Sequence, residues 1–185
     1  MPNEFTAATS VSLPAQSGVA HVYPSVHLAD AFEIHLPAGA TRDPDTLARF
    51  IFAEQPAWVG FLLGVRDAIV ARLGLKTARQ LATLAATAKA ERVGIFRIYS
   101  STPTEIVLGE DDKHLDFRLS VLCTGGPAPE GKHRLTLSTV VHCHNLTGRI
   151  YILIIAPFHR MVVKASLRRA AHVGWPLANA ARSDN

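Results

Sequence analysis

The densest group of polar side chains in the sequence lies in its second half, at a spacing that suits ligand binding or proton transfer. Its members are Glu110, Asp111, Asp112, His114, Asp116 and Arg118. Asp116 and Arg118 are two residues apart, so on a strand they share a face and their charges can pair. If this face lines a cavity, the charges orient the polar group of a ligand. If it faces solvent, it is the ordinary polar side of a half-exposed antiparallel strand, and the sequence leaves both interpretations open.

His142 and His144 form an HxH pair on one face of a predicted strand. Two imidazoles at this spacing bind a transition metal when a third ligand converges on them, and His114 or Asp116 could supply that ligand. Spacing alone does not define a complete ligand set. Two ordinary polar residues on a strand are the simpler interpretation, so we expect no metal site.

The same histidines and Asp116 are the clustered candidates for acid–base chemistry, because a histidine beside a carboxylate in a dry pocket can move protons. Cys143 lies between His142 and His144, but strand alternation points it to the opposite face, which argues against a Cys–His pair. The sequence contains no nucleophile elbow, phosphate loop or GxGxxG motif. We therefore assign no catalytic residue, expect no cofactor, and leave open whether the chain is an enzyme.

A basic stripe lies near the end of the chain, with Arg160, Lys164 and Arg168 at four-residue spacing. Such a stripe can meet acidic lipid or nucleic acid, but it is more often the solvated side of a helix, and cations late in a helix complement its dipole. The net charge of +4 is mild, and nucleic-acid binding usually gathers basic and aromatic residues on one surface. We expect no nucleic-acid partner.

The elements that must position these residues follow from hydrophobic periodicity and from turn residues. A strand is predicted over 27–36, and a helix follows it, with Asp43 as the cap and Pro44 at the first position. Further strands with short links indicate an antiparallel sheet. The predicted later elements are a second helix over 57–73, strands over 93–99, 105–108, 114–123 and 135–144, and a terminal helix over 148–171.

The terminal helix begins with an apolar run over 150–158, which predicts burial on every side, and Pro157 should bend it. Nine apolar residues are too few to span a bilayer, which needs about twenty, so we expect no stable membrane insertion. The N-terminus lacks the features of a secretory signal, and two cysteines are few. Both observations favour a cytoplasmic location.

The chain of 185 residues is 48% hydrophobic and 18% charged, slightly more apolar than an average domain. A large core, a bound apolar ligand or a self-association surface could each absorb the excess. We predict disordered tails at 1–20 and 174–185, and a single domain over 21–173.

Two segments carry a resemblance to a known family: GEDDKHLDFRLSVL (109–122) and VVHCHNLTGRIYILIIAPFHRMVVKASLRR (140–169). Together with LADAFEIHLP and PAWVGFLLGVRD, they resemble a bacterial family, domain of unknown function twenty-eight sixty-seven, over residues 28–170. That family is similar to the Bet v 1/START-like superfamily, which includes polyketide cyclases. The resemblance implies an α+β helix-grip fold, in which a curved antiparallel sheet wraps around a long C-terminal helix and leaves a cavity. The family has no established activity to carry over.

We therefore predict a domain that binds a small apolar or aromatic metabolite in a cavity between the sheet and the C-terminal helix. Its apolar walls would include Leu153, Pro157 and Phe158. The polar group of the ligand would meet some of five residues, namely His114, Asp116, Arg118, His142 and His144. Two alternatives stay open. One is a cyclase- or hydratase-like enzyme that uses histidine and aspartate in the same pocket, and the other is a non-catalytic homodimeric interaction domain.

Overall fold

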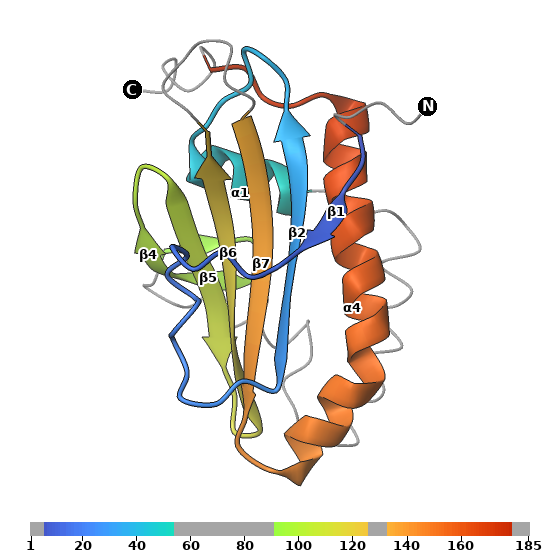
Figure 1. Ribbon diagram of the computed structural model, residues 1–185. Coiled ribbons are helices and arrows are strands. Elements are labelled where there is room, and N and C mark those ends of the chain that lie inside the picture. Colours follow the sequence, from blue (N-terminus) through green and yellow to red (C-terminus); the bar gives the residue numbers. More distant parts are fainter. Residues whose placement is uncertain (1–5, 54–90, 126–132, 179–185) are drawn as a thin grey trace.

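The protein is an α+β structure built on one seven-stranded antiparallel sheet, as shown by a computed structural model that describes residues 6–53, 91–125 and 133–178 (Figure 1). The strand order is β1-β2-β7-β6-β5-β4-β3. The long C-terminal helix α4 (Leu146–Val173) runs along one face of the curved sheet. This confirms the predicted fold class and is consistent with the helix-grip arrangement. The predicted second helix, 57–73, lies outside the described residues.

The strands lie close to their predicted positions. They are β1 (Thr9–Val11), β2 (Leu28–Leu36), β3 (Arg92–Val93), β4 (Phe96–Ser101), β5 (Glu105–Asp111), β6 (Leu115–Thr124) and β7 (His133–Cys143). The single strand expected over 93–99 was wrong: Gly94 adopts a positive φ of 58°, which makes a tight turn between β3 and β4. The strand expected over 105–108 was too short, because β5 continues to Asp111 through pairing with β6.

Strand alternation separates the two faces of the sheet. Phe32, Leu119 and Leu137 pack in one apolar cluster with Val163 and Leu167 of α4. We call this side the inner face. The intervening residues of β6 and β7 point away from α4, to what we call the outer face. The core therefore lies between the inner face and the helices.

Local sequence signals define the two described helices. In α1 (Pro44–Ala53), the Asp43 carboxylate accepts a hydrogen bond from the Thr46 amide at 2.9 Å, as expected for an N-cap. At the start of α4, the Asn145 side chain caps the helix by accepting from the Gly148 amide at 3.1 Å. A Cβ on Gly148 would lie 2.3 Å from the carbonyl oxygen of His114, so only glycine allows α4 to begin this close to the sheet.

The segment before β2, residues 6–27, crosses the outer face of the sheet (Figure 1), and we call it the N-terminal segment. The prediction of a disordered tail over 1–20 was wrong for residues 6–20, because β1 pairs with β2 and Val19 is fully buried. The predicted tail after residue 173 was wrong in the same way for 174–178: Trp175 is buried, and the Thr41 amide donates to the Pro176 carbonyl at 2.7 Å. Small and polar residues gave no periodicity from which these long-range contacts could be inferred.

Candidate functional site

Arg118 is the centre of a polar cluster on the outer face. Its guanidinium lies 3.5 Å from the ring centroid of Tyr99 and 5.6 Å from that of Tyr23. It also donates to the Asp111 carboxylate at 2.7 Å. Gly109 pairs with Arg118 across β5 and β6, and a Cβ there would approach the Arg118 Cδ to 3.0 Å. The glycine thus leaves room for the long side chain to lie across the sheet.

The electrostatics of this cluster follow from its geometry. Burial alone would raise the pKa of Asp111, but the hydrogen bonds from Arg118 and Tyr99 outweigh it and lower the pKa below its ordinary value. Burial, together with the hydrogen bond that it donates to Asp111 at 2.8 Å, raises the pKa of Tyr99 to about 12. Burial likewise raises the pKa of Tyr23. Both phenols therefore stay neutral, and Arg118 and Asp111 stay charged, over the physiological pH range.

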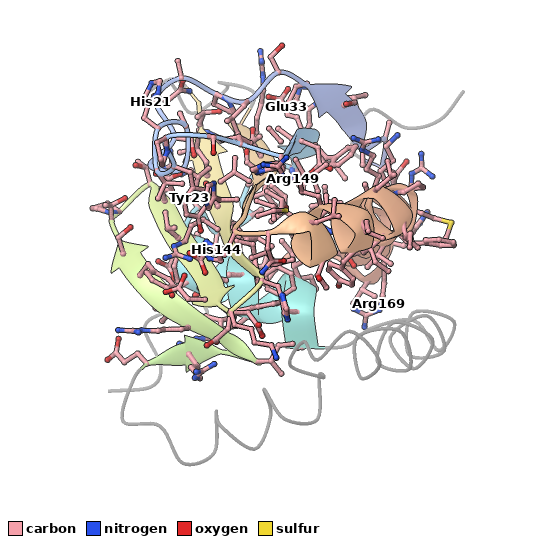
Figure 2. All side chains as sticks on the ribbon, turned by 90° about the horizontal axis from the view of Figure 1, so that it is seen from below. His21, Tyr23, Glu33, His144, Arg149 and Arg169 are labelled. Carbon is pink, nitrogen blue, oxygen red and sulfur yellow. The ribbon has the colours of Figure 1, made fainter. Side chains whose placement is uncertain are left out.

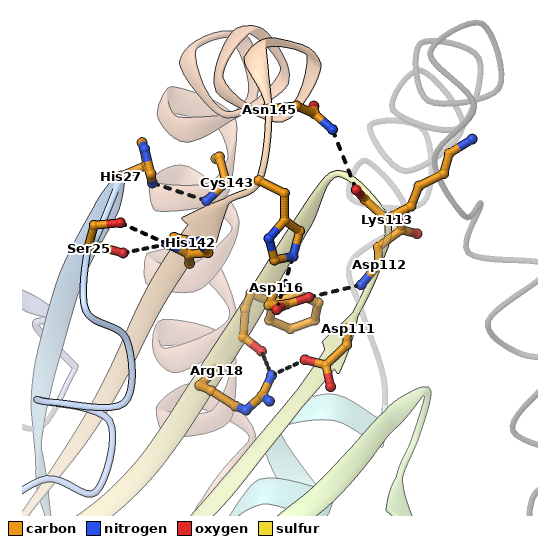
Figure 3. Close-up of polar contacts among 12 residues, drawn as sticks. Ser25, His27, Asp111, Asp112, Lys113, Asp116, Arg118, His142, Cys143 and Asn145 are labelled. Carbon is orange, nitrogen blue, oxygen red and sulfur yellow. Dashed lines mark hydrogen bonds and ion pairs between the residues drawn. The ribbon is translucent and has the colours of Figure 1, made fainter.

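Three imidazoles lie next to this cluster, His142 and His144 at the end of β7 and His27 at the end of the N-terminal segment (Figure 3). The His142 ring lies 5.5 Å from the His27 ring and 5.2 Å from the His144 ring, between centroids. His142 Nδ1 is 2.7 Å from the Ser25 carbonyl oxygen, and His144 Nε2 is 3.1 Å from Asp116 Oδ2. His27 Nδ1 accepts a hydrogen bond from the backbone amide of Cys143 at 3.0 Å. These three imidazoles therefore join the N-terminal segment to the sheet.

Four of the five predicted site residues come together on the outer face: Asp116, Arg118, His142 and His144. His114 lies apart, in the turn between β5 and β6, where its Nδ1 is 3.1 Å from the side-chain oxygen of Asn145, the cap of α4. The sequence left open whether this polar face lines a cavity or faces solvent. In the structure it points away from α4, because the alternate residues Leu115 and Leu119 point to the inner face. A role for the five residues in ligand binding stays a prediction.

His142 and His144 each contact another group of the protein. Among the described residues, no three His, Cys, Asp or Glu side chains are grouped as a metal ion would require. His142 contacts Ser25, and His144 contacts Asp116. Cys143, as the alternation predicted, points to the opposite face, where it is buried with Leu115 and Tyr151.

A second polar cluster lies on the inner face and contains none of the five residues predicted from the sequence. Asp30 of β2 points toward α4, and its side chain is only 7% exposed. Its Oδ1 lies 3.4 Å from His159 Nε2, and its Oδ2 accepts from Arg160 Nε at 3.4 Å. Neither Asp30 Oδ1 nor His159 Nε2 has a hydrogen-bond partner among the described residues.

One signal in the sequence pointed to Asp30. The inward positions of β2 are Leu28, Asp30, Phe32, Ile34 and Leu36. A carboxylate at one of five inward positions interrupts an otherwise apolar face, and buried carboxylates are rare unless they have a partner or a function. Its partners on α4 could not be recognised from the pattern, because they follow it by about 130 residues.

The predicted apolar walls on α4 need correction. Leu153 is 78% exposed and Phe158 is 45% exposed, so these side chains point away from the sheet, and Pro157 is exposed as well. Tyr151 and Ile152 are the buried residues of this part of the helix. Burial on every side was wrong, because an apolar run without periodicity does not indicate which side of the helix meets the sheet.

Comparison with known proteins gives one match. Residues 22–166, more than half of the chain, match the model of a family described as protein of unknown function (DUF2867). No curated protein and no solved structure matches the chain. The match includes both polar clusters, the sheet from β2 onward and most of α4. It confirms the family predicted from the two signature segments, and the chain belongs to the DUF2867 family of proteins of unknown function.

Proposed function

We propose that this chain binds a small apolar or aromatic molecule with one polar group, between the inner face of the sheet and α4. The observation that carries the proposal is the incompletely bonded pair Asp30–His159. A buried polar atom without a hydrogen bond costs about 1–3 kcal/mol, so such atoms in an apolar layer need an explanation. A ligand that completes the hydrogen bonds is one.

The chemistry of the pair defines the polar group that it would accept. Asp30 Oδ1 accepts hydrogen bonds, and His159 Nε2 donates one in the tautomer that carries its proton there. A hydroxyl group can donate to the first and accept from the second. Arg160 holds the other carboxylate oxygen and keeps the charge of Asp30 in place. The expected ligand is therefore an alcohol or phenol with an apolar body.

The apolar residues around Asp30 also support a ligand with a polar group and an apolar body. The inner face carries two separate clusters of buried residues, one containing Leu28 and the other Phe32. Asp30 lies between these two on β2 and pairs with Thr139 of β7. A polar position between two apolar regions suits a ligand with a polar group and an apolar body. The sheet-and-helix arrangement also suggests the Bet v 1/START-like architecture.

The test compares matched substitutions on the two faces. We would measure binding of 2-naphthol, an aromatic alcohol, by titration calorimetry, and identify co-purified molecules by mass spectrometry of solvent extracts. Asp30→Asn should weaken naphthol binding by about tenfold, the equivalent of about 1.4 kcal/mol. Asp116→Asn, the same change on the outer face, should leave the affinity unchanged. Thermal melting would show that both variants are folded.

Two results would contradict this proposal. If the wild-type chain binds no naphthol and yields no extracted molecule, binding at this layer fails as a function. If Asp116→Asn weakens binding and Asp30→Asn does not, the ligand belongs to the outer face and to the five residues named from the sequence.

A second candidate function rests on the His144–Asp116 contact of 3.1 Å. Both side chains are partly exposed, so a substrate can reach them, and a histidine beside a carboxylate is a suitable acid–base pair. The reaction would be of the cyclase or hydratase type. Turnover of a panel of enones and polyketide-like substrates, lost in His144→Ala, would favour it. Equal turnover in His144→Ala and the wild type would remove it.

A further inference from the structure

The side of α4 that faces away from the sheet carries an exposed apolar stripe. Its members follow one another at helical spacing and are Leu146, Ile150, Leu153, Ile154, Phe158 and Met161. The opposite side of the same helix packs on the sheet through residues such as Ile152, Val163 and Leu167. The helix thus has two apolar sides, and in the described part of the chain the sheet uses only one.

The charges on α4 are all of one sign. The helix sequence contains Arg149, Arg160, Lys164, Arg168 and Arg169, and no aspartate or glutamate. These five cations compare with a net charge of +4 for the whole chain. Arg149 lies four residues before Leu153 and the exposed Arg168 lies seven residues after Met161, so helical periodicity places both beside the stripe. Arg160 instead contacts Asp30, and Lys164 lies over the Phe32 ring. Arg149 and Arg169 project from different sides of α4 (Figure 2).

We infer that this face of α4 attaches the protein to the surface of an anionic lipid bilayer. Apolar side chains flanked by arginine and lysine are the features of helices that lie in the membrane interface. The apolar stripe would enter the acyl boundary, and the cations would contact acidic headgroups. This attachment lies on the opposite side of α4 from Asp30 and does not depend on the proposed ligand.

The positive charge of α4 favours an anionic bilayer over a second copy of the chain as the partner of the apolar stripe. A two-fold dimer through this stripe would bring two cationic helices without carboxylates against each other, and like charges at an interface are unfavourable. A nucleic acid would satisfy the arginines but not the apolar side chains between them. An anionic bilayer satisfies both.

The packing of α4 on the sheet defines how deeply the helix can enter. By length and composition alone α4 could cross a bilayer, and only 22% of its most apolar window is buried. However, Tyr151 and Leu167 are buried against the remainder of the fold, and a spanning helix would have to leave that contact. The packing of α4 on the sheet is therefore compatible with attachment at the membrane surface.

The experiment is a vesicle sedimentation assay with the intact chain. Phosphatidylcholine vesicles that contain phosphatidylglycerol would be compared with pure phosphatidylcholine vesicles, at low and high salt. The wild type should bind the anionic vesicles, and high salt should weaken that binding. Leu153→Glu should reduce partitioning by about tenfold or more, because it puts a carboxylate at the centre of the stripe. Arg149→Gln should reduce it by about fivefold.

The matched control is Leu177→Glu, which places the same charge at an exposed leucine outside α4 and should leave vesicle binding unchanged. Equal binding by Leu153→Glu and Leu177→Glu would overturn the inference. So would a concentration-dependent dimer of the wild type that Leu153→Glu dissociates without any vesicle binding, because the occupant would then be a second copy. Naphthol binding should persist in Leu153→Glu, which keeps a failure here distinct from a failure of the proposed ligand site.

Discussion

The two faces of the sheet are joined to their neighbouring segments by different interactions. The inner face meets α1 and α4 through fully buried apolar side chains such as Phe32, Leu137 and Leu167. The outer face meets the N-terminal segment largely through hydrogen bonds and ring contacts of polar residues, with a small apolar cluster around Val19. The inner contact therefore depends on side-chain volume, whereas the outer contact depends on the identity of individual polar groups.

Glu105 shows how the outer contact works. Its carboxylate is buried, and it accepts hydrogen bonds from the Ser17 hydroxyl at 2.6 Å, the Gly18 amide at 2.9 Å and the Ser120 hydroxyl at 2.5 Å. Three donors from two distant segments thus replace the water that the carboxylate loses. The inner face differs at Asp30, whose Oδ1 has no hydrogen bond among the described residues and lies 3.4 Å from His159 Nε2. On this comparison, the outer polar contacts fasten the N-terminal segment to the sheet, and the inner pair is the one for which we propose a ligand.

The largest effect should come from removing volume on the inner face. Leu167 is fully buried, so Leu167→Ala should lower the free energy of unfolding by about 3 kcal/mol, measured from urea denaturation. Leu177→Ala, at an exposed site outside α4, is the matched control and should change it by less than about 0.5 kcal/mol. Similar losses in both variants would contradict the assignment of the core to the inner face.

The second largest effect on the free energy of unfolding should come from a substitution on the outer face. Glu105→Gln keeps the side-chain volume but replaces one acceptor oxygen by a donor, which then faces the donors of Ser17 and Gly18. We expect a loss of about 2 kcal/mol in the free energy of unfolding, together with faster proteolysis of the N-terminal segment. Glu33→Gln, on β2 with a long 3.6 Å contact to Arg134, should change the free energy little. If Glu105→Gln were neutral, the outer contact would depend on volume after all.

Arg118→Met should cost about 1–2 kcal/mol, because it removes the contact with two tyrosine rings and the ion pair with Asp111. The ion pair also gives this loss a pH dependence. The pKa of Asp111 is lower in the folded chain than its ordinary value of 3.8, so its contribution to stability is present above that value and is lost as the pH falls through the folded pKa. The difference between wild type and variant should shrink at acidic pH. A difference independent of pH would mean that the ring contacts act alone.

The smallest effect should be the pH response of His27. Burial, with smaller contributions from the charges of Arg149 and His142, lowers its pKa below 6.5 in the folded chain. The unfolded chain therefore takes up the proton first, so stability from this group is present above pH 6.5 and falls as the solution is acidified. Protonation at Nδ1 would also break the hydrogen bond from the Cys143 amide.

His27→Gln should remove part of this dependence, observed as a flatter profile of melting temperature against pH. The control is His21→Gln, because His21 is an exposed histidine of the same segment. If the two variants gave the same profile, the contact between His27 and β7 would not contribute to the pH response.

Much of the local structure could be predicted from the sequence. The alternation of β6 separated Leu115, Phe117 and Leu119 from Asp116 and Arg118 correctly, because side chains on a strand alternate whatever the strand packs against. The start of α1 at Asp43 and Pro44 was also correct, since capping depends on adjacent residues. Of the five residues predicted for the site, four come together on the face away from α4, and their role in ligand binding stays a prediction.

The contacts that the sequence analysis missed have one physical cause in common: each joins segments that are far apart in the chain. Asp30, His159 and Arg160 meet only because β2 pairs with β7 and α4 then returns along the inner face. The N-terminal segment is similar, since Ser17 finds its acceptor in Glu105, 88 residues later. Neither contact leaves a periodic pattern in the sequence, because each depends on which distant segment arrives at that place.

The sequence by itself determined the family, the alternation of the predicted strands and the position where α1 begins, since each of these depends on neighbours a few residues apart. The start of α4 was predicted at residue 148, two residues after its first residue, Leu146. Only the tertiary structure decided which side of α4 meets the sheet, which face the N-terminal segment covers, and where a buried carboxylate finds its partners. Those outcomes depend on the pairing of β2 with β7, strands about 100 residues apart in the chain. The free energy of such contacts belongs to the assembled fold rather than to any one segment.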